Sequence, residues 1–332
     1  MKNFRINTNY IPLIITICLF CGLFTIGSIV YRGFFSLQVI LNLLVDNAFL
    51  IIVALGETMV IIMGGIDLSV GALIALSTMI VGFSMANWNW HPALAIVAVL
   101  IACSVFGFLQ GYLIVYRKFQ PFIATLCGMF VARGLCFIIN QDTIPIQDPF
   151  FVKMATTRLK IMDGVSISIT VVIALVILAV YIYMAHYTKF GRTIYAIGGN
   201  EQSARLMGLP VDRTKVLVYT LSGFTSGIGG IVFCLYMLSA FGLHAVALEM
   251  DAIAAAVIGG TIMTGGVGMV VGTLFGVLIE GMIQTIITFQ GTLNSWWTRI
   301  AIAFLLLAFI VVQRMLVLRR EAKKTIRSVE FT

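Results

Sequence analysis

The amino-acid sequence predicts an all-α polytopic membrane protein with about ten transmembrane helices joined by short loops. Hydrophobic residues make up 61% of its 332 residues and charged residues only 10%, whereas soluble domains carry about 25% charged residues. The apolar residues fall in long runs of roughly 20 residues, the length that a helix needs to cross a bilayer. The runs do not alternate apolar and polar residues as the strands of a membrane β-barrel do.

Ten apolar runs set the expected order of the helices. They cover residues 10–31, 37–63, 67–86, 93–116, 121–140, 166–187, 216–240, 245–263, 267–289 and 297–317. The eighth run is short and edged by glycine, so it either spans the bilayer or re-enters it. We expect the whole chain, 1–332, to form a single transmembrane domain, with its longest loops at 140–165 and 188–215.

The positive charges orient these helices. Lys and Arg gather in the short cytoplasmic loops of membrane proteins. With ten spans and the N-terminus inside, most of the 21 Lys and Arg residues lie on the cytoplasmic side, and so do both termini. The net charge of +8 is therefore interpreted as a signal of topology and not as a nucleic-acid site.

The sequence shows no pattern for a metal, a bound cofactor or catalysis. Its single C-x-x-C pair, at 18–21, lies in the middle of the first apolar run, where packed thiols are the simpler interpretation. The three histidines form no cluster, and no G-x-x-x-x-G-K-[ST] motif is present to hold ATP phosphates. We expect no catalytic residue and no metal ligand, which argues against a membrane-embedded enzyme.

Glycines indicate both close packing and two breaks. Pairs at G-x-x-x-G spacing, such as Gly107/Gly111 and Gly223/Gly227, predict helices in close contact. The segments "MGGIDLSVGALIAL" at 63–76 and "VIGGTIMTGGVGMVVGTLFG" at 257–276 should interrupt helices. Asp67 is then expected to cap the helix that follows the first break, by accepting hydrogen bonds from its first turn. Contact between Asp67 and a solute is the alternative.

Polar residues within the apolar runs indicate a transport path. Ionisable groups in a bilayer usually face a partner or a water-filled cavity. Helix-to-helix hydrogen bonds explain any one of them equally well, and the tryptophans also suit anchoring at the interface. As a set, they favour transport over a structural scaffold. The candidates are Asp46, Asn47, Glu57, Asp67, Glu280, Gln284, Asn294, Trp296 and Trp297.

The loop at 188–215 is polar and compact. Gly198 and Gly199 suggest a turn, Asn200 an N-cap, and Glu201 an anion in the first helical turn, where the helix dipole favours it. The helix should end at Gly208, before Pro210. Ala204 and Met207 would give it a small apolar edge. So short a helix needs support from its own bundle or from a partner, and a groove in another subunit is one such support.

The sequence resembles the sugar-type, ribose-permease-like permeases of bacterial ABC importers. The resemblance rests on "TKFGRTIYAIGGNEQSARLMG" at 188–208, "GGIDLSVG" at 64–71 and "IGGTIMTGGVGMVVGTLFG" at 258–276, and it extends over nearly the whole chain. Within this family the galactofuranose importers are the most similar. That likeness is carried by "DNAFL" at 46–50, "IPI" at 144–146, "LMG" at 206–208, "DAIAAAVIGG" at 251–260 and "GTLNSWWTRIAI" at 291–302.

The resemblance implies a permease fold and a set of partners. The chain would pair with a second permease, as a heterodimer in the galactofuranose systems, above cytoplasmic ATPases that bind the ATP and Mg²⁺. A periplasmic binding protein would deliver galactofuranose or a related monosaccharide to this multi-pass protein of the bacterial inner membrane. The family's ATPase-coupling loop corresponds to Gly191, Arg192, Gly199, Asn200, Glu201, Ala204 and Gly208, with Ser203 departing from the alanine common in relatives. A cation-coupled sugar transporter that uses Asp46, Glu57 or Glu280 is the alternative.

Overall fold

Most of the residues that the structure describes lie in helices. The computed structural model describes residues 11–162, 165–291, 294 and 296–329, so the basic residues expected near the N-terminus, Lys2 and Arg5, lie outside it. Within these described ranges, seven helices are long and apolar enough to cross a membrane: α1 (Ile11–Val30), α4 (Val70–Trp88), α5 (Pro92–Tyr116), α6 (Pro121–Ile139), α8 (Ile169–Tyr187), α11 (Val211–Met237) and α13 (Val270–Gln290). Each corresponds to one expected span, which confirms the polytopic all-α prediction.

The other three expected spans are interrupted or differ in length. The second is a pair, α2 (Leu37–Asp46) and α3 (Ala48–Ile62), bent by 60° at Asn47. The eighth is α12 (Leu248–Ile258), whose 11 residues reach only about 16 Å, far less than a bilayer's apolar thickness of about 30 Å. The tenth is α14 (Trp296–Val329), whose first part, Trp296–Val311, is apolar.

Helix α3 forms the centre of the bundle. Its sequence is apolar on all sides, and 14 of its 15 residues are buried, as expected for a helix surrounded by others. Helix α11 packs beside α5, and here the expected glycine contacts are confirmed: a Cβ on Gly107 would overlap the Tyr219 carbonyl, and one on Gly223 would overlap that of Cys103. The outer faces of α5 and α6 expose large apolar side chains, as a lipid-facing surface requires.

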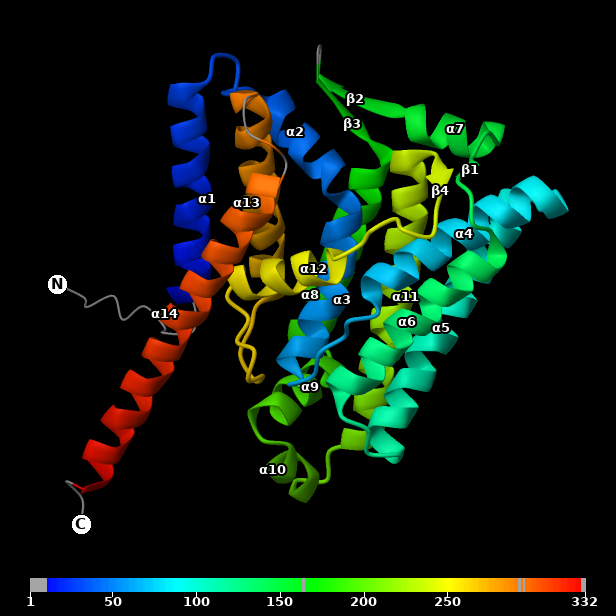
Figure 1. Cartoon of the computed structure of the whole chain (residues 1–332). Coiled ribbons are helices and arrows are strands. Elements are labelled where there is room, and N and C mark those ends of the chain that lie inside the picture. The colour runs from blue at the N-terminus through cyan, green and yellow to red at the C-terminus, as the bar shows by residue number, and fades with distance from the viewer. Residues whose placement is uncertain (1–10, 163–164, 292–293, 295, 330–332) are drawn as a thin grey trace.

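The bundle has two differently built ends (Figure 1). At one end, here called the hairpin end, lie α7 (Pro149–Thr156) and the antiparallel strands β2 (Arg158–Met162) and β3 (Val165–Ser168). Beside them β1 (Ile144–Pro145) pairs with β4 (Ser239–Ala240). At the opposite end, the α10 end, lie α9 (Lys189–Gly199) and α10 (Glu201–Leu206).

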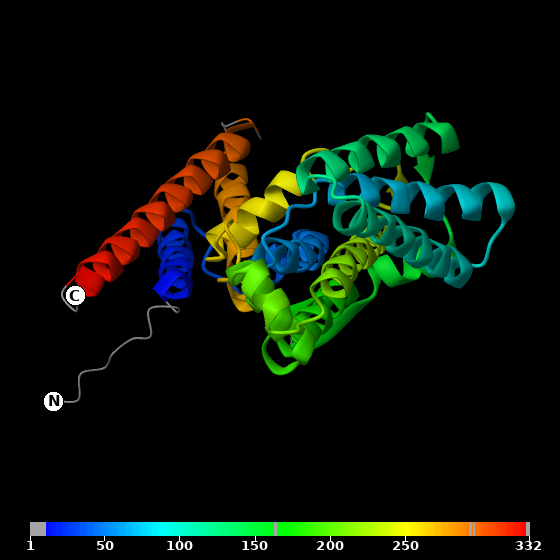
Figure 2. The same cartoon turned by 90° about the horizontal axis from the view of Figure 1, so that it is seen from below.

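Two irregular stretches without helix interrupt the bundle where the sequence predicts breaks. Residues 63–69 lead from α3 to α4, and residues 259–269 form a loop between α12 and α13 that reaches the α10 end (Figure 1). Seen along the bundle, α1, α13 and α14 lie to one side of α3, whereas α4, α5, α6 and α11 lie to the other (Figure 2).

An arginine inside the membrane region supports a third irregular segment. Arg133 of α6 donates hydrogen bonds to the carbonyls of Gly242, His244 and Ala245 at 2.8, 2.6 and 3.0 Å. These residues precede α12, where no regular hydrogen-bond ladder satisfies the backbone. Non-helical backbone at membrane depth needs such internal partners, so Arg133 makes this segment possible.

Candidate functional site

A polar cavity lies in the half of the bundle toward the hairpin end. It consists of two adjoining spaces of about 290 and 440 Å³, which share Asn47, Leu50, Asp251 and Gln284 in their walls. The walls come from α2, α3, α11, α12, α13 and the start of α14. Ligand sites for small molecules typically have volumes of about 300–1,000 Å³, so this cavity is large enough for a small solute.

The bend between α2 and α3 supplies one wall of this cavity. Asn42 and Asp46 share a face of α2, as their spacing predicts, and both line the larger space. Gln38, one turn earlier on the same face, donates a hydrogen bond to the Asn42 side chain at 2.8 Å. Asp46 accepts a long hydrogen bond of 3.4 Å from Tyr236 of α11, a residue that the sequence reasoning missed.

The opposite wall carries Glu280 and an ion pair. Glu280 is only 3% exposed, and neither carboxylate oxygen has a hydrogen-bond partner among the described residues. Arg299 of α14 contacts Asp251 of α12 at 3.3 Å. A buried acceptor without a partner is costly unless a ligand or water supplies a donor. This wall can therefore bind hydroxyl groups.

Aromatic residues border the cavity, but not all of those expected from the sequence. Trp296 and Phe289 lie in the walls, and Trp296 is 70% exposed. The neighbouring Trp297 is 51% exposed and lines neither space. Asn294 lines neither space, and its side chain accepts a hydrogen bond from the Trp296 backbone at 2.9 Å, so it positions the start of α14.

Glu57 and Asp67 lie elsewhere, in the packed interior beside α5 and α11. Both are 0% exposed. Asp67 is not the N-cap residue of α4, because α4 begins at Val70 with Ser69 in the cap position. Its carboxylate still accepts one backbone hydrogen bond just before the helix, from the Ser69 N–H at 2.9 Å. It also accepts hydrogen bonds from the Ser69 and Ser222 hydroxyls at 2.6 and 2.8 Å, and its own N–H donates to Glu57 at 3.2 Å. The pair joins the first break to α3 and α11 and lines neither space of the polar cavity.

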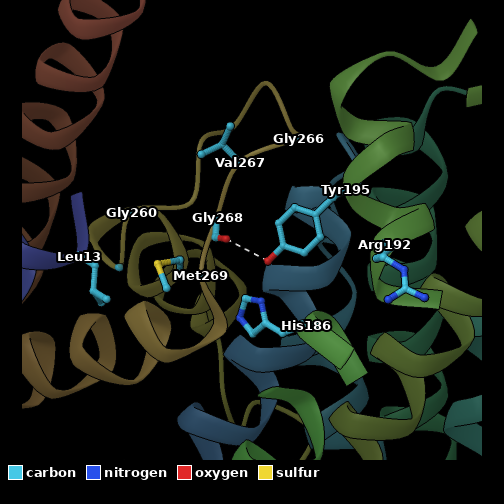
Figure 3. A pocket seen from close by; sticks show the side chains of 11 residues that line it. Leu13, His186, Arg192, Tyr195, Gly260, Gly266, Val267, Gly268 and Met269 are labelled. Atoms are coloured by element: carbon cyan, nitrogen blue, oxygen red, sulfur yellow. Dashed lines mark hydrogen bonds between the residues drawn. The ribbon is translucent and has the colours of Figure 1, made fainter. Parts of the chain in front are cut away.

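The loop at 188–215 holds two helices, where the sequence predicts one. The expected turn at Gly198 and Gly199 is wrong, since both belong to the last turn of α9. Gly191 lets α9 approach α8, because a Cβ there would overlap the Ala185 carbonyl. Arg192 is exposed and lines a cavity of about 400 Å³ together with Tyr195 and the loop after α12 (Figure 3).

The caps of α10 follow the sequence prediction. The Asn200 side chain accepts a hydrogen bond from the Ser203 N–H at 2.8 Å, as an N-cap does. At the other end Gly208 has a positive φ of 76°, and the N–H groups of Gly208 and Leu209 donate to the carbonyls of Arg205 and Ala204. This is the Schellman arrangement that glycine favours.

Ion pairs hold α10 against the first turn of α11. Arg205 makes two hydrogen bonds to Asp212, at 2.7 and 3.0 Å. Glu201 contacts Lys215 at 2.9 Å and Arg205 at 3.4 Å. A six-residue helix does not persist alone in water, so these pairs fix its position on the bundle.

The apolar face of α10 differs from the expected edge of Ala204 and Met207. Ala204 is 0% exposed and packs into the chain's own core with Leu209. Leu206 is 88% exposed and Met207 is 68% exposed, so these two form the outward tip of the loop. Ala204 thus seats the helix on its bundle, whereas Leu206 and Met207, which the sequence reasoning had not paired, face away from it.

Comparison with known proteins identifies the kind of molecule that carries these features. Residues 39–310 match the family described as branched-chain amino acid transport system, permease component. The chain belongs to this permease family. The permease is 44% identical to the inner membrane ABC transporter permease protein YjfF of Escherichia coli (strain K12), over 92% of each chain.

Two further relatives are similar over most of their length. The permease is 39% identical to the fructose import permease protein FruG of Bifidobacterium longum, over 94% of this chain and 93% of that one. It is 36% identical to the ribose import permease protein RbsC of Haemophilus influenzae, over 87% and 89%. No solved structure matches it. Its family and relatives are permease components of transporters, so the chain is a multi-pass transport permease and not an enzyme.

Proposed function

We propose that this permease is the membrane subunit of an ATP-driven importer that carries a monosaccharide, galactofuranose, into a bacterium. The observation that carries the proposal is α10, a short helix that its own chain holds in place while Leu206 and Met207 remain exposed. An exposed apolar tip on a helix that ion pairs hold in place is suited to insertion into a groove of a partner subunit. The coupling residues expected from the resemblance lie in α9, in α10 or at the ends of α10: they are Gly191, Arg192, Gly199, Asn200, Glu201, Ala204 and Gly208.

The names of the relatives support the class of solute and the source of energy. Two of them are named for the import of fructose and ribose, and a third as an ABC transporter permease of the inner membrane. Galactofuranose itself is supported by the sequence resemblance at 46–50, 251–260 and 291–302. On this proposal ATP and Mg²⁺ bind a cytoplasmic ATPase, a periplasmic protein delivers the sugar, and a second, different permease completes a heterodimer in the inner membrane.

The polar cavity is the proposed sugar path. Asp46, Asn47, Glu280 and Gln284 place carboxylate and amide groups in its walls, which suits the hydroxyl groups of a sugar. The cavity opens in the half away from α10, so with α10 and both termini in the cytoplasm it receives the sugar from outside. ATP binding moves α10, and the bundle then releases the sugar inward.

Uptake by cells that lack this permease tests the proposal. Cells receive the chain together with its ATPase, partner permease and binding protein, and labelled galactofuranose, ribose and fructose are compared. We expect uptake of galactofuranose that stops when the ATPase cannot hydrolyse ATP and continues in the presence of an uncoupler. Uptake that needs no ATPase and collapses with the uncoupler would refute the proposal in favour of cation coupling. Preferential uptake of ribose or fructose would refute the assignment of galactofuranose, but not the proposal of ATP-driven sugar import.

A further inference from the structure

Glycines from three distant segments meet at one point near the α10 end. They are Gly64 after α3, Gly198 and Gly199 at the end of α9, and Gly265 and Gly266 in the loop after α12. These five residues are called the glycine junction below. A Cβ on Gly266 would lie 2.8 Å from the Gly199 Cα, and one on Gly265 would lie 2.9 Å from the Gly64 nitrogen. The three backbones are therefore in direct contact, and a side chain on Gly198, Gly265 or Gly266 would have no space between them.

Gly198 is the most confined residue of the glycine junction. A Cβ there would overlap both the Ile62 carbonyl oxygen and the Gly266 nitrogen. Those two atoms are already joined, because the Gly266 N–H donates a hydrogen bond of 2.8 Å to the Ile62 oxygen. The end of α9 thus lies against the bond that ties the end of α3 to the loop after α12.

A second contact joins the same elements. Tyr195, one turn before Gly198 on α9, donates a hydrogen bond of 2.9 Å from its hydroxyl to the Gly268 carbonyl (Figure 3). Gly265 and Gly266 both have positive φ values, of 84° and 76°, which side chains adopt only with strain. The loop is therefore shaped to bring its backbone to α9.

The glycine junction lies at the end of α3 and just before α13, and both helices also line the polar cavity. Helix α3 ends at Ile62 and begins beside Asn47 and Leu50, which line the cavity. Helix α13 begins at Val270, just after the loop, and carries Glu280 and Gln284 farther along. Packed helices move as rigid elements, so a shift of α9 displaces both cavity walls together.

We propose that Gly198 and Gly266 are positioning residues of transport, which link the coupling helix α10 to α3 and α13 through backbone contact. This inference rests on the proposed function. Movement imposed on α10 passes to α9, because the two helices are separated only by Asn200. From α9 it reaches α3 and α13 through the backbone contact of Gly198 with Gly266 and through the Tyr195 hydrogen bond to the Gly268 carbonyl.

The test compares Gly198→Ala with Gly134→Ala in the assembled transporter. Gly134 lies in α6, and a Cβ there meets nothing within 4 Å. Both variants are assembled in lipid vesicles with the ATPase, partner permease and binding protein, and ATP hydrolysis and uptake of the sugar that the wild type imports are measured. We expect Gly198→Ala to hydrolyse ATP but to import at least about 10-fold less sugar per ATP, a loss within the usual range of coupling between sites. Gly134→Ala should match the wild type.

If Gly198→Ala imports as much sugar per ATP as the wild type, the inference is overturned. ATP-dependent sugar uptake by the wild type in the same assay would leave the proposed function standing. If Gly198→Ala does not assemble, Tyr195→Phe decides, since it removes only the hydroxyl that bonds to Gly268. A fall of about 3-fold in sugar per ATP is then expected, in keeping with the net value of one hydrogen bond. Full coupling in Tyr195→Phe would overturn the inference. A wild type without ATP-dependent import would instead refute the proposed function.

Discussion

Shortening the side chain of Leu206 tests directly whether α10 enters a groove of an ATPase. Leu206 is 88% exposed at the tip of the loop, so Leu206→Ala removes no packing from the permease itself. It removes three carbon atoms that a partner would bury. At about 0.8 kcal/mol per buried methylene, and with nearly the whole side chain available, the loss is about 2 kcal/mol of binding free energy. This corresponds to a dissociation constant about 30-fold higher.

The assay is the equilibrium binding of the purified ATPase to the permease pair in lipid nanodiscs. Leu94→Ala is the matched control, because Leu94 is 59% exposed near the start of α5, toward the hairpin end. We expect Leu94→Ala to bind the ATPase as the wild type does, and Leu206→Ala to bind it more weakly. Equal affinities of the two variants would refute the reasoning that assigns α10 to the contact.

Three further predictions follow from the same loop and the helix contacts. Glu201→Lys should leave the permease inserted but abolish ATP-driven uptake, because it sets a third cation beside Lys215 and Arg205; membrane insertion and uptake are measured together, and normal uptake would remove Glu201 from the mechanism. Burial opposes ionisation of the Glu201 carboxyl, but Lys215 and Arg205 outweigh it and hold the pKa of Glu201 below 4.5. The stabilising effect of this carboxylate is thus present above its usual pKa and lost as pH falls through the lowered pKa, so hydrogen-exchange protection of α10 should be constant from neutral pH to about pH 5 and fall only in stronger acid; loss above pH 5 would contradict this. Gly223→Ala should lower the thermal unfolding temperature in detergent, through a cost of about 1–3 kcal/mol for forcing α11 from α5; the open site of Gly134→Ala should show no loss, and equal behaviour of the two would contradict the contact with Cys103.

The sequence predicted the membrane helices well, because each one is marked by the hydrophobicity of about 20 residues taken together. Each of the ten expected spans has a helical counterpart, including the short eighth, α12. The 60° bend between α2 and α3 was not foreseen. No proline or glycine marks it, and it arises where Asn47 turns back to bond the Leu43 carbonyl at 2.9 Å.

The candidate site was predicted less completely, because its geometry depends on contacts between distant segments. The sequence suggested polar path residues, and all three of Glu280, Glu57 and Asp67 are buried. Only the packing of distant helices places Glu280 in the cavity wall and leaves Glu57 and Asp67 in the protein core. In α10 a helix of six residues has too few turns to reveal which side is buried. The buried side of α10 is determined by the ion pair of Arg205 with Asp212 and by the contact of Ala204 with the core. Both contacts involve residues outside α10, so the pattern of residues within the helix does not reveal them.

The shortness of α12 has a consequence for what keeps it in the membrane. A segment enters the bilayer from the translocon when its own apolar length is sufficient, but α12 has 11 residues and carries Glu249 and Asp251 in its first turn. It packs against α3 and α13, both of which belong to longer apolar spans. We therefore expect α12 to be held at membrane depth by these neighbours and not by its own length.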